Sequence, residues 1–511
     1  MRQPFALSFC PQRFRRIQLS FFLFALTCPL LPIMTQAQVT FNGSTSVNLG
    51  SQAVGSRSAT VPLSFTVGAG TKVGSIAVLT TGMAGKDFAQ ATGSTCTTMT
   101  YVTTTNCMVN VSFKPLVTGS RQGAVAFYAG TAKTSTALAT VPICGVGTGP
   151  QVVFGPGGRQ TSVGGHFISP QGVAVDAAGN VYVTDIGLQE VFKITPSGVQ
   201  NPIGTGLEVP EDAAVDGAGN LYVTDSHADV VFKVTPGGVQ TMIGSGFSYP
   251  VGVAVDGAGN VYVSDPFVPT VFQITPGGAQ TMVGSGYNTP AGVAVDAAGN
   301  VYVADTFSAT VFKITPKGTQ TMIGSGLVSP AAVAVDAAEN VYITDSATDT
   351  VYEVTPSGNQ TTVSTGLDVP NGVTLDGFGN LYVADTFSGH VTRIDRADAP
   401  SLKFDPTKIN STSMDSPKTV EVENIGNASL TFSALTYPPD FPEASGNNEC
   451  TSSTSLAAAS TCALIIDFSP VTTFSPGSSR LLRESVKLTT NDLNVPKKVQ
   501  RVVVTGKELR K

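Results

Sequence analysis

The stretch 290–326 reads PAGVAVDAAGNVYVADTFSATVFKITPKGTQTMIGSG and is one copy of a pattern that occurs six times. A fixed period of this length is typical of repeat architectures. Within each copy, four short apolar runs are separated by turn-forming residues, and none has helical spacing. Four strands per copy and six copies predict a six-bladed β-propeller with one sheet per blade. The prolines that open the copies lie forty residues apart: Pro170, Pro210, Pro250, Pro290, Pro330 and Pro370.

The residues that recur in every copy have structural explanations. Asp176 and Asn180, like their equivalents in the other copies, flank a tight turn in which the aspartate bonds its own backbone. We expect the tyrosine that follows, Tyr182 in the first copy, to pack between blades. The second aspartate, Asp185 in the first copy, ends the second strand. We interpret it as a loop cap, and the alternative is a ring of metal ligands.

The pattern P-x-G-V-A-V-D-x-x-G-N-V-Y-V-x-D resembles the consensus of the NHL-repeat family over residues 152–396. The resemblance implies the propeller fold and leaves function open. NHL propellers include protein-binding and RNA-binding modules, sensor domains of bacterial kinases and a peptide-amidating lyase. The family often carries a basic residue in the loop after the second aspartate. This chain departs from that pattern, because its loops read IGLQE, SHADV, PFVPT, TFSAT, SATDT and TFSGH.

The repeat begins out of phase. Residues 155–165 match the fourth-strand segment of a copy, whereas the sixth copy contains only three strands. We therefore predict that residues 152–164 form the outer strand of the blade made by residues 371–396. Such a closure would remove the exposed sheet edges at the two ends of the repeat.

The N-terminal segment indicates export. Residues 1–37 combine a basic start at Arg13, Arg15 and Arg16 with an apolar stretch and a small-residue cleavage site before Gln38. We expect a cleaved signal peptide over 1–37, and the alternatives are an uncleaved anchor or a lipoprotein. The mature chain, with no predicted membrane span, would be periplasmic, at the cell surface or secreted.

Two further segments predict β-sandwiches. Residues 38–149 and 400–511 alternate apolar and polar residues in short runs, and they resemble each other around a pair of cysteines. Both resemble the immunoglobulin-like domains of the abnormal-spindle/Hydin type, which implies a spacer or adhesion module without catalytic residues. The predicted fold is all-β, with a six-bladed propeller over 150–399 between two immunoglobulin-like sandwiches.

The cysteines fit an oxidising compartment. By spacing, Cys96 pairs with Cys107 and Cys450 pairs with Cys462, which predicts two short-loop disulfides. Cys144 is left over. We interpret it as a free, buried thiol that packs as a small hydrophobic residue.

Charge is unevenly distributed along the chain. Residues 150–399 contain 7 Lys and Arg against 23 Asp and Glu, whereas residues 38–149 contain 6 against 1. Lys and Arg that neutralise phosphates supply most of the affinity of proteins for nucleic acids. A propeller this acidic is therefore not expected to bind RNA or DNA.

A search for catalytic motifs finds no G-x-S-x-G, H-E-x-x-H or phosphate-binding loop. A propeller ligand would lie over the axis, on the face formed by the loops before each first strand and after each second strand. On that face the copies differ most in blades six, one and two. The candidate ligand-binding residues there are Gln171, Glu190, Glu211, Asp212, His227, Asn371, His390 and His166.

These observations favour binding over catalysis. The amidating lyase of the NHL family holds zinc through histidines, and no histidine of this chain lies on a first strand, so no ligand set carries over. No motif of the antibiotic-inactivating lyase propellers is found either. We expect an exported, non-enzymatic binding or scaffold protein whose propeller recognises a protein, peptide or cell-envelope glycan, without a cofactor. The alternatives are a lyase or hydrolase dependent on zinc or calcium and a purely structural surface protein; the three histidines would then be solvated loop residues.

Overall fold

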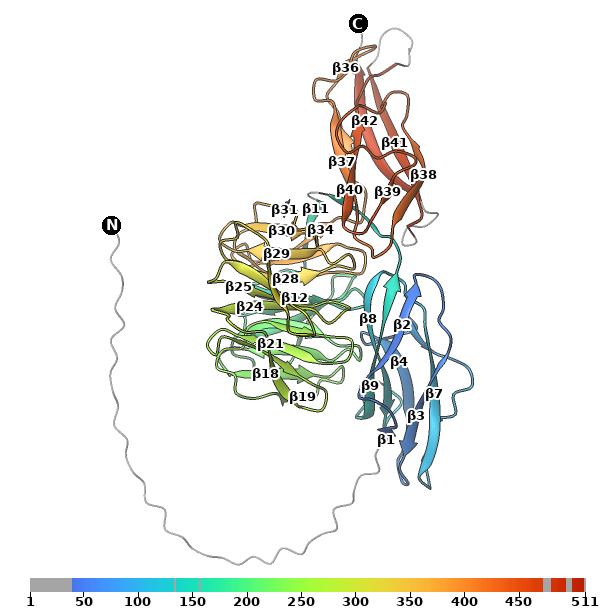
Figure 1. Ribbon diagram of the computed structural model, residues 1–511, viewed down its shortest axis with the longest axis vertical. Helices are drawn as coiled ribbons and strands as arrows, with labels where there is room; N and C mark the ends of the chain where they lie inside the picture. The colour runs from blue at the N-terminus through green and yellow to red at the C-terminus, as the bar shows by residue number, and fades with distance from the viewer. Residues whose placement is uncertain (1–38, 133–134, 156–157, 472–478, 493–498, 510–511) are drawn as a thin grey trace, which may run out of the picture. The chain divides into compact units, whose positions relative to one another are not determined.

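A computed structural model describes residues 39–132, 135–155, 158–471, 479–492 and 499–509 (Figure 1). These residues belong to one compact unit, Ala37–Lys511. All regular elements of the described residues are β-strands, as the sequence predicts. The predicted signal peptide, residues 1–37, lies outside the described residues.

Residues 159–395 form six four-stranded antiparallel sheets, which are the blades of a propeller. The first strands contact one another around a closed ring, in which β12 of blade one meets β16 of blade two and β32 of blade six. Blades one to three are β12 (Pro170–Val175), β13 (Val181–Asp185), β14 (Glu190–Ile194) and β15 (Gln200–Ile203); β16 (Pro210–Val215), β17 (Leu221–Asp225), β18 (Val230–Val234) and β19 (Gln240–Ile243); and β20 (Val253–Val255), β21 (Val261–Asp265), β22 (Thr270–Ile274) and β23 (Gln280–Val283). Blades four to six are β24 (Pro290–Val295), β25 (Val301–Asp305), β26 (Thr310–Ile314) and β27 (Gln320–Ile323); β28 (Pro330–Val335), β29 (Val341–Asp345), β30 (Thr350–Val354) and β31 (Gln360–Ser364); and β32 (Pro370–Leu375), β33 (Leu381–Asp385), β34 (His390–Asp395) and β11 (Arg159–Val163).

The first aspartate of each copy organises the turn between the first and second strands. In blade one, Asp176 accepts the backbone N–H groups of Ala178 (2.8 Å) and Asn180 (2.9 Å) and the hydroxyl of Tyr182 (3.1 Å). Tyr182 also packs in one apolar cluster with Leu221 of blade two. The predictions of a tight turn and of blade-to-blade packing are therefore confirmed.

The second aspartate is a loop cap. Asp185 is fully buried, and its carboxylate accepts backbone N–H groups of Ile168 (2.8 Å) and Ser169 (3.0 Å) before the first strand. It also accepts the N–H groups of Gly187 (2.9 Å) and Leu188 (3.1 Å) after the second strand. Its partners are the backbone amides of the two loops on the face where a ligand is expected, so it holds these loops in place.

The closure of the ring is partly as predicted. β11 pairs antiparallel with β34, from Arg159 opposite Asp395 to Val163 opposite Val391, and Figure 1 shows the two strands side by side. The prediction is wrong for residues 152–155, because β10 (Val152–Gly155) pairs instead with β37 (Lys418–Asn424) of the C-terminal segment. The physical reason is burial: Val152, Val153 and Phe154 are consecutive buried apolar residues, whereas the outer strands of blades one to four are largely open to solvent.

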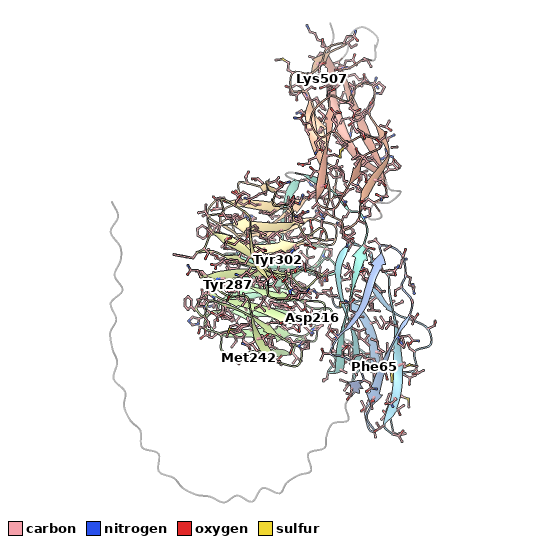
Figure 2. All side chains as sticks on the ribbon, in the orientation of Figure 1. Phe65, Asp216, Met242, Tyr287, Tyr302 and Lys507 are labelled. Carbon is pink, nitrogen blue, oxygen red and sulfur yellow. A yellow bond between two sulfur atoms is a disulfide. The ribbon has the colours of Figure 1, made fainter. Side chains whose placement is uncertain are left out.

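Each flanking segment is a sandwich of two sheets over one apolar core. The N-terminal core contains Phe65 (labelled in Figure 2), Phe113 and Phe127, and the C-terminal core contains Phe441 and Phe468. The N-terminal sheets have the strand orders β1-β3-β7-β6 and β2-β9-β8-β4-β5, and the C-terminal sheets β10-β37-β40 and β35-β42-β41-β38-β39, with β36 beside β42. The N-terminal strands are β1 (Val39–Phe41), β2 (Val47–Ala53), β3 (Val61–Val67), β4 (Ser75–Thr80), β5 (Met83–Ala84), β6 (Phe88–Gln90), β7 (Thr105–Phe113), β8 (Gly119–Tyr128) and β9 (Ala137–Thr148). The remaining C-terminal strands are β35 (Ser401–Lys403), β36 (Thr407–Lys408), β38 (Leu430–Thr436), β39 (Ser455–Leu456), β40 (Ser460–Ile466), β41 (Arg480–Thr490) and β42 (Val499–Leu509). Their assignment as immunoglobulin-like domains stays a prediction.

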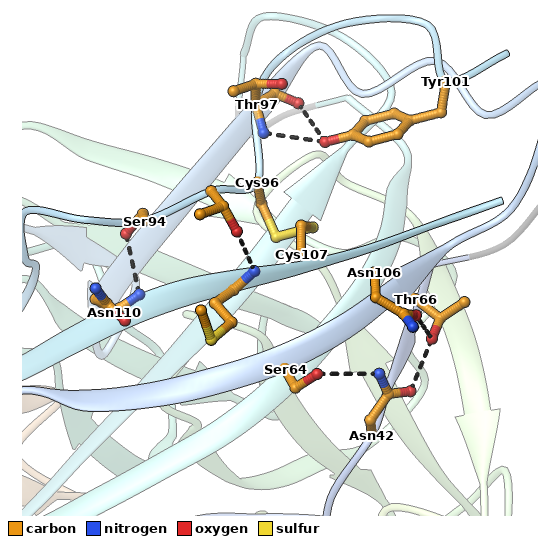
Figure 3. Close-up of a disulfide and its surroundings, with 12 residues drawn as sticks. Asn42, Ser64, Thr66, Ser94, Cys96, Thr97, Tyr101, Asn106, Cys107 and Asn110 are labelled. Carbon is orange, nitrogen blue, oxygen red and sulfur yellow. Dashed lines mark hydrogen bonds between the residues drawn. A yellow bond between two sulfur atoms is a disulfide. The ribbon is translucent and has the colours of Figure 1, made fainter. Parts of the chain in front are cut away.

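Both predicted disulfides are present. Figure 3 shows the bond between Cys96 and Cys107, which ties a loop to strand β7; the second joins Cys450 to Cys462. Cys144 is free and half-buried. Burial, reinforced by the charge of Asp256, raises the pKa of its thiol to about 11, so little of the reactive thiolate forms at neutral pH.

Candidate functional site

A cavity of about 370 Å³ lies between the first strands of all six blades. Its mouth is on the side of the loops that the second aspartates cap, because the residue after each opening proline lines it. These six residues are Gln171, Glu211, Val251, Ala291, Ala331 and Asn371. The other end is apolar, since the last residue of each first strand lines it: Val175, Val215, Val255, Val295, Val335 and Leu375. The cavity is therefore nearly sixfold in its walls and asymmetric at its mouth.

Two adjacent carboxylates from blade two make the mouth asymmetric. Glu211 accepts hydrogen bonds from the hydroxyls of Ser226 (2.8 Å) and Tyr249 (3.3 Å). Asp212 accepts the backbone N–H groups of Ala213 (2.8 Å) and, in blade three, Val253 (3.0 Å). These bonds hold both side chains in defined positions at the mouth.

The position of Asp212 depends on its neighbour in blade one. A Cβ added to Gly172 would lie 2.4 Å from Oδ1 of Asp212, which is too close for any non-bonded contact. It would also lie 2.6 Å from the Cα atom of Asp212, so a larger residue at 172 would displace the backbone of blade two as well as the carboxylate. The close approach is common to the repeat, because a Cβ added to Gly292 would likewise lie 2.4 Å from the Cα atom of Ala332.

Burial shapes the protonation of both carboxylates. It raises the pKa of Asp212 to about 7, against the two backbone hydrogen bonds, and the nearby Glu211 contributes further. Burial also raises the pKa of Glu211, although the bonds from Ser226 and Tyr249 oppose the shift. Two negative charges at the mouth are therefore unfavourable, and a cation bound there would stabilise both carboxylates in their charged form.

Four of the eight residues predicted for the site line the cavity. Besides Glu211 and Asp212 they are Gln171 and Asn371. The amide Nδ2 of Asn371 donates to Oγ1 of Thr386 (2.8 Å). These side chains come from blades six, one and two. At the position after the opening proline, blades three, four and five place only apolar residues, although Thr306 of blade four and Ser346 of blade five also line the cavity.

The other four predicted residues are exposed and do not line the cavity: Glu190, His166, His227 and His390. His227 pairs with Glu208, and this hydrogen bond, more than the charge, raises the pKa of the imidazole. His390 bonds the backbone carbonyl of Ser388 through Nδ1 (2.5 Å). Within the described ranges, no group of three or more His, Cys, Asp or Glu has the geometry to hold a metal ion.

Sequence reasoning missed an apolar rim around the mouth. Phe267, Phe307 and Phe387 share one position, the second residue after the second aspartate, in blades three, four and six. Ile168 and Val328 share another, two residues before the opening proline. The exposed fractions of these five residues run from 57% to 76%. The loops PFVPT, TFSAT and TFSGH carried this signal, but a search for polar departures from the repeat passed over it.

The rim and the carboxylates are physically connected. The rings of Phe267 and Tyr249 are stacked with centroids 4.7 Å apart, and the hydroxyl of Tyr249 bonds Glu211. A group bound at the rim near Phe267 would therefore also meet the acidic sector.

A second buried cluster of charge lies away from the cavity. The Arg396 guanidinium is almost fully buried and pairs with Glu353 (3.0 Å) of β30 and with Glu423 of β37. It also donates to the hydroxyl of Tyr342 (2.8 Å). Burial raises the pKa of Glu423 well above its usual range, although Arg396 opposes the shift. The cluster joins blade five to the C-terminal sandwich, which gives it a structural explanation.

Comparisons with known proteins find likenesses among solved structures alone. No family model and no curated protein matches the chain. Among solved structures, the virginiamycin B lyase of Staphylococcus aureus is 14% identical over 46% of this chain and 82% of its own, with a TM-score of 0.38. A gluconolactonase from Xanthomonas campestris is 14% identical over 47% and 90% (TM-score 0.42), and a chain of the nidogen/laminin complex is 21% identical over 46% and 98% (TM-score 0.39). None of these likenesses supports a statement about function, and the NHL resemblance stays a prediction.

Proposed function

We propose that the chain is an exported, non-enzymatic binding protein whose recognition site is the mouth of the axial cavity. The NHL-type propeller of residues 150–399 would recognise a protein, peptide or cell-envelope glycan. The immunoglobulin-like sandwiches of residues 38–149 and 400–511 would act as spacers, with β10 completing the second one. The signal peptide of residues 1–37 would be removed on export.

The observation that carries this proposal is the acidic pair of blade two. Glu211 and Asp212 stand at the mouth where blade three has Val251 and Gly252. A specific site needs a place where six similar blades differ, and this pair provides the charged side chains in a cavity whose other lining residues are uncharged. Buried carboxylates cost free energy, so their presence needs an explanation beyond packing.

Export is supported by the two disulfides. Such bonds persist in oxidising compartments and are rare in the cytosol. Among the described residues, no helix reaches the length and apolarity that crossing a membrane requires.

The test is an array of capped peptides and envelope glycans probed with the full mature chain. We expect the bound features to be lost with Glu211→Gln and retained with His227→Ala, because Glu211 lines the cavity and His227 does not. Equal retention by both variants, or no bound feature at all, would contradict the proposal.

One observation favours a second candidate function. A carboxyl with a pKa of about 7, as at Asp212, can take up and release protons near neutral pH. This suits acid–base work by a lyase or hydrolase at the same mouth. Zinc or calcium, on which such an enzyme would depend, would need ligands beyond Glu211 and Asp212. Stoichiometric metal in the purified protein that is absent from Asp212→Asn would favour catalysis over binding alone.

A further inference from the structure

The face around the cavity mouth combines an apolar rim with an acidic centre. We propose that it docks a protein partner whose exposed segment inserts a Lys or Arg side chain into the mouth and lays apolar residues on the rim. This inference rests on the proposed function and names the class of partner. The rim is defined by Ile168, Phe267, Phe307, Val328 and Phe387.

The rim has the character of an interaction surface. Contiguous apolar patches mark contact sites, whereas single exposed apolar residues are common on proteins. Here five lie at only two positions of the repeat, both in the loops that surround the mouth. The capping bonds of Asp185 and its equivalents hold these loops. The surface is therefore largely formed before a partner binds, which limits the entropy lost on docking.

Charge complementarity identifies the group at the centre. The described residues that line the cavity include no Lys, Arg or His. They do include the two carboxylates, Glu211 and Asp212. A cationic side chain would supply the charge that the pair lacks. Apolar contacts around it would exclude water, and a lower dielectric strengthens an ion pair.

The rim distinguishes a protein segment from a small amine. A free amine of cavity size would reach the carboxylates without touching Phe307 or Phe387, whose exposed side chains would then stay in water. A neutral glycan would leave the carboxylates without a counter-charge. A cationic side chain flanked by apolar residues satisfies both features at once.

Docking should depend on pH in a defined direction. The groups that face the acidic pair are Ser226, Tyr249 and Asp225, and the last raises the pKa of Glu211. Because a cation binds the deprotonated pair, affinity should rise as pH increases through about 7, where Asp212 loses its proton. Binding should release protons into the buffer.

The experiment uses isothermal titration of the full mature chain with acetyl-Leu-Lys-Leu-amide. The same peptide with norleucine in place of lysine removes only the charge, and acetyl-Ala-Lys-Ala-amide removes only the apolar flanks. We expect at least tenfold weaker binding for the first and at least threefold for the second. The double variant Glu211→Gln/Asp212→Asn should bind the lysine peptide as weakly as the wild type binds the norleucine peptide. Phe307→Ala should bind it as weakly as the wild type binds the alanine-flanked peptide.

The control is Met282→Ala, which removes a side chain of similar exposure (73%) from the outer strand β23 and should leave affinity unchanged. No binding of the lysine peptide to the wild-type chain, or equal binding of the norleucine peptide, would overturn the inference. Binding of n-butylamine and both lysine peptides with one affinity would overturn the protein partner while leaving the cavity as a binding site.

Discussion

Replacing Asp212 with asparagine should change how stability depends on pH. The folded-state pKa of about 7 lies above the usual 3.8, so the folded protein holds this proton more tightly than the unfolded chain does. The resulting destabilisation is absent below pH 4, grows between pH 4 and 7, and is complete above pH 7. At 1.36 kcal/mol per pKa unit, it amounts to at most about 4 kcal/mol.

The substitution has an opposing cost that does not depend on pH. Asp212 accepts one N–H on each oxygen, from Ala213 and from Val253, and asparagine has only one acceptor oxygen. The lost bond should cost about 1–2 kcal/mol. Asp212→Asn should therefore be less stable than the wild type at pH 4.5 by at most about 1 kcal/mol and more stable at pH 8 by about 2–3 kcal/mol.

Urea unfolding of the mature chain at pH 4.5, 6 and 8, followed through the transition of the propeller, measures this difference. The control is Asp229→Asn, an exposed carboxylate of the same blade at a positive φ that asparagine tolerates. The control should track the wild type at each pH. A difference between Asp212→Asn and wild type that stays constant from pH 4.5 to 8 would refute the reasoning.

Four further predictions follow from the fold. Gly158→Ala should lower the free energy of unfolding by several kcal/mol, because the new Cβ would lie 1.8 Å from the carbonyl oxygen of Asp395 in β34, which pairs with the closing strand β11. Gly165→Ala is the control, because a Cβ there meets nothing within 4 Å. Equal melting temperatures of the two variants would contradict the closure. Non-reducing peptide mapping should find Cys144 unbridged, and losing either disulfide should cost about 3 kcal/mol for its short loop. Arg396→Met should cost about 3–5 kcal/mol by leaving Glu353 and Glu423 buried without their cation, with unchanged thermal unfolding as the contrary result. The propeller should not shift labelled RNA or DNA at physiological salt, and a salt-sensitive shift would show that its acidity does not govern binding.

Much of the fold could be predicted because the same sequence pattern occurs six times. Period, turn residues and strand pattern agree in every copy, and residues such as Asp176 and Tyr182 act within one copy or with the next. The strand with which β10 pairs could not be predicted in this way. Its partner, β37, lies more than 260 residues further along the chain, and only the burial of Val152, Val153 and Phe154 marks it as a core strand.

The candidate site was predictable only in part. Glu211, Asp212, Gln171 and Asn371 could be found as departures from the repeat at the two positions after the opening proline, which the ring geometry brings to one mouth. The histidines are departures too, but His166 and His227 lie in exposed loops and His390 is the exposed first residue of β34, so none of them reaches the cavity. The apolar rim went unnoticed because its residues are ordinary by type and unusual only in being exposed together.

The most direct measurement uses the difference between blades two and three. Replacing Glu211 and Asp212 by Val and Gly restores the residues of blade three, Val251 and Gly252, and should preserve the fold because that blade already accommodates them. The account predicts that this double variant melts as a cooperative propeller and no longer binds the peptides or glycans that the wild-type chain captures. Undiminished binding by a folded double variant would show that the recognition site lies elsewhere.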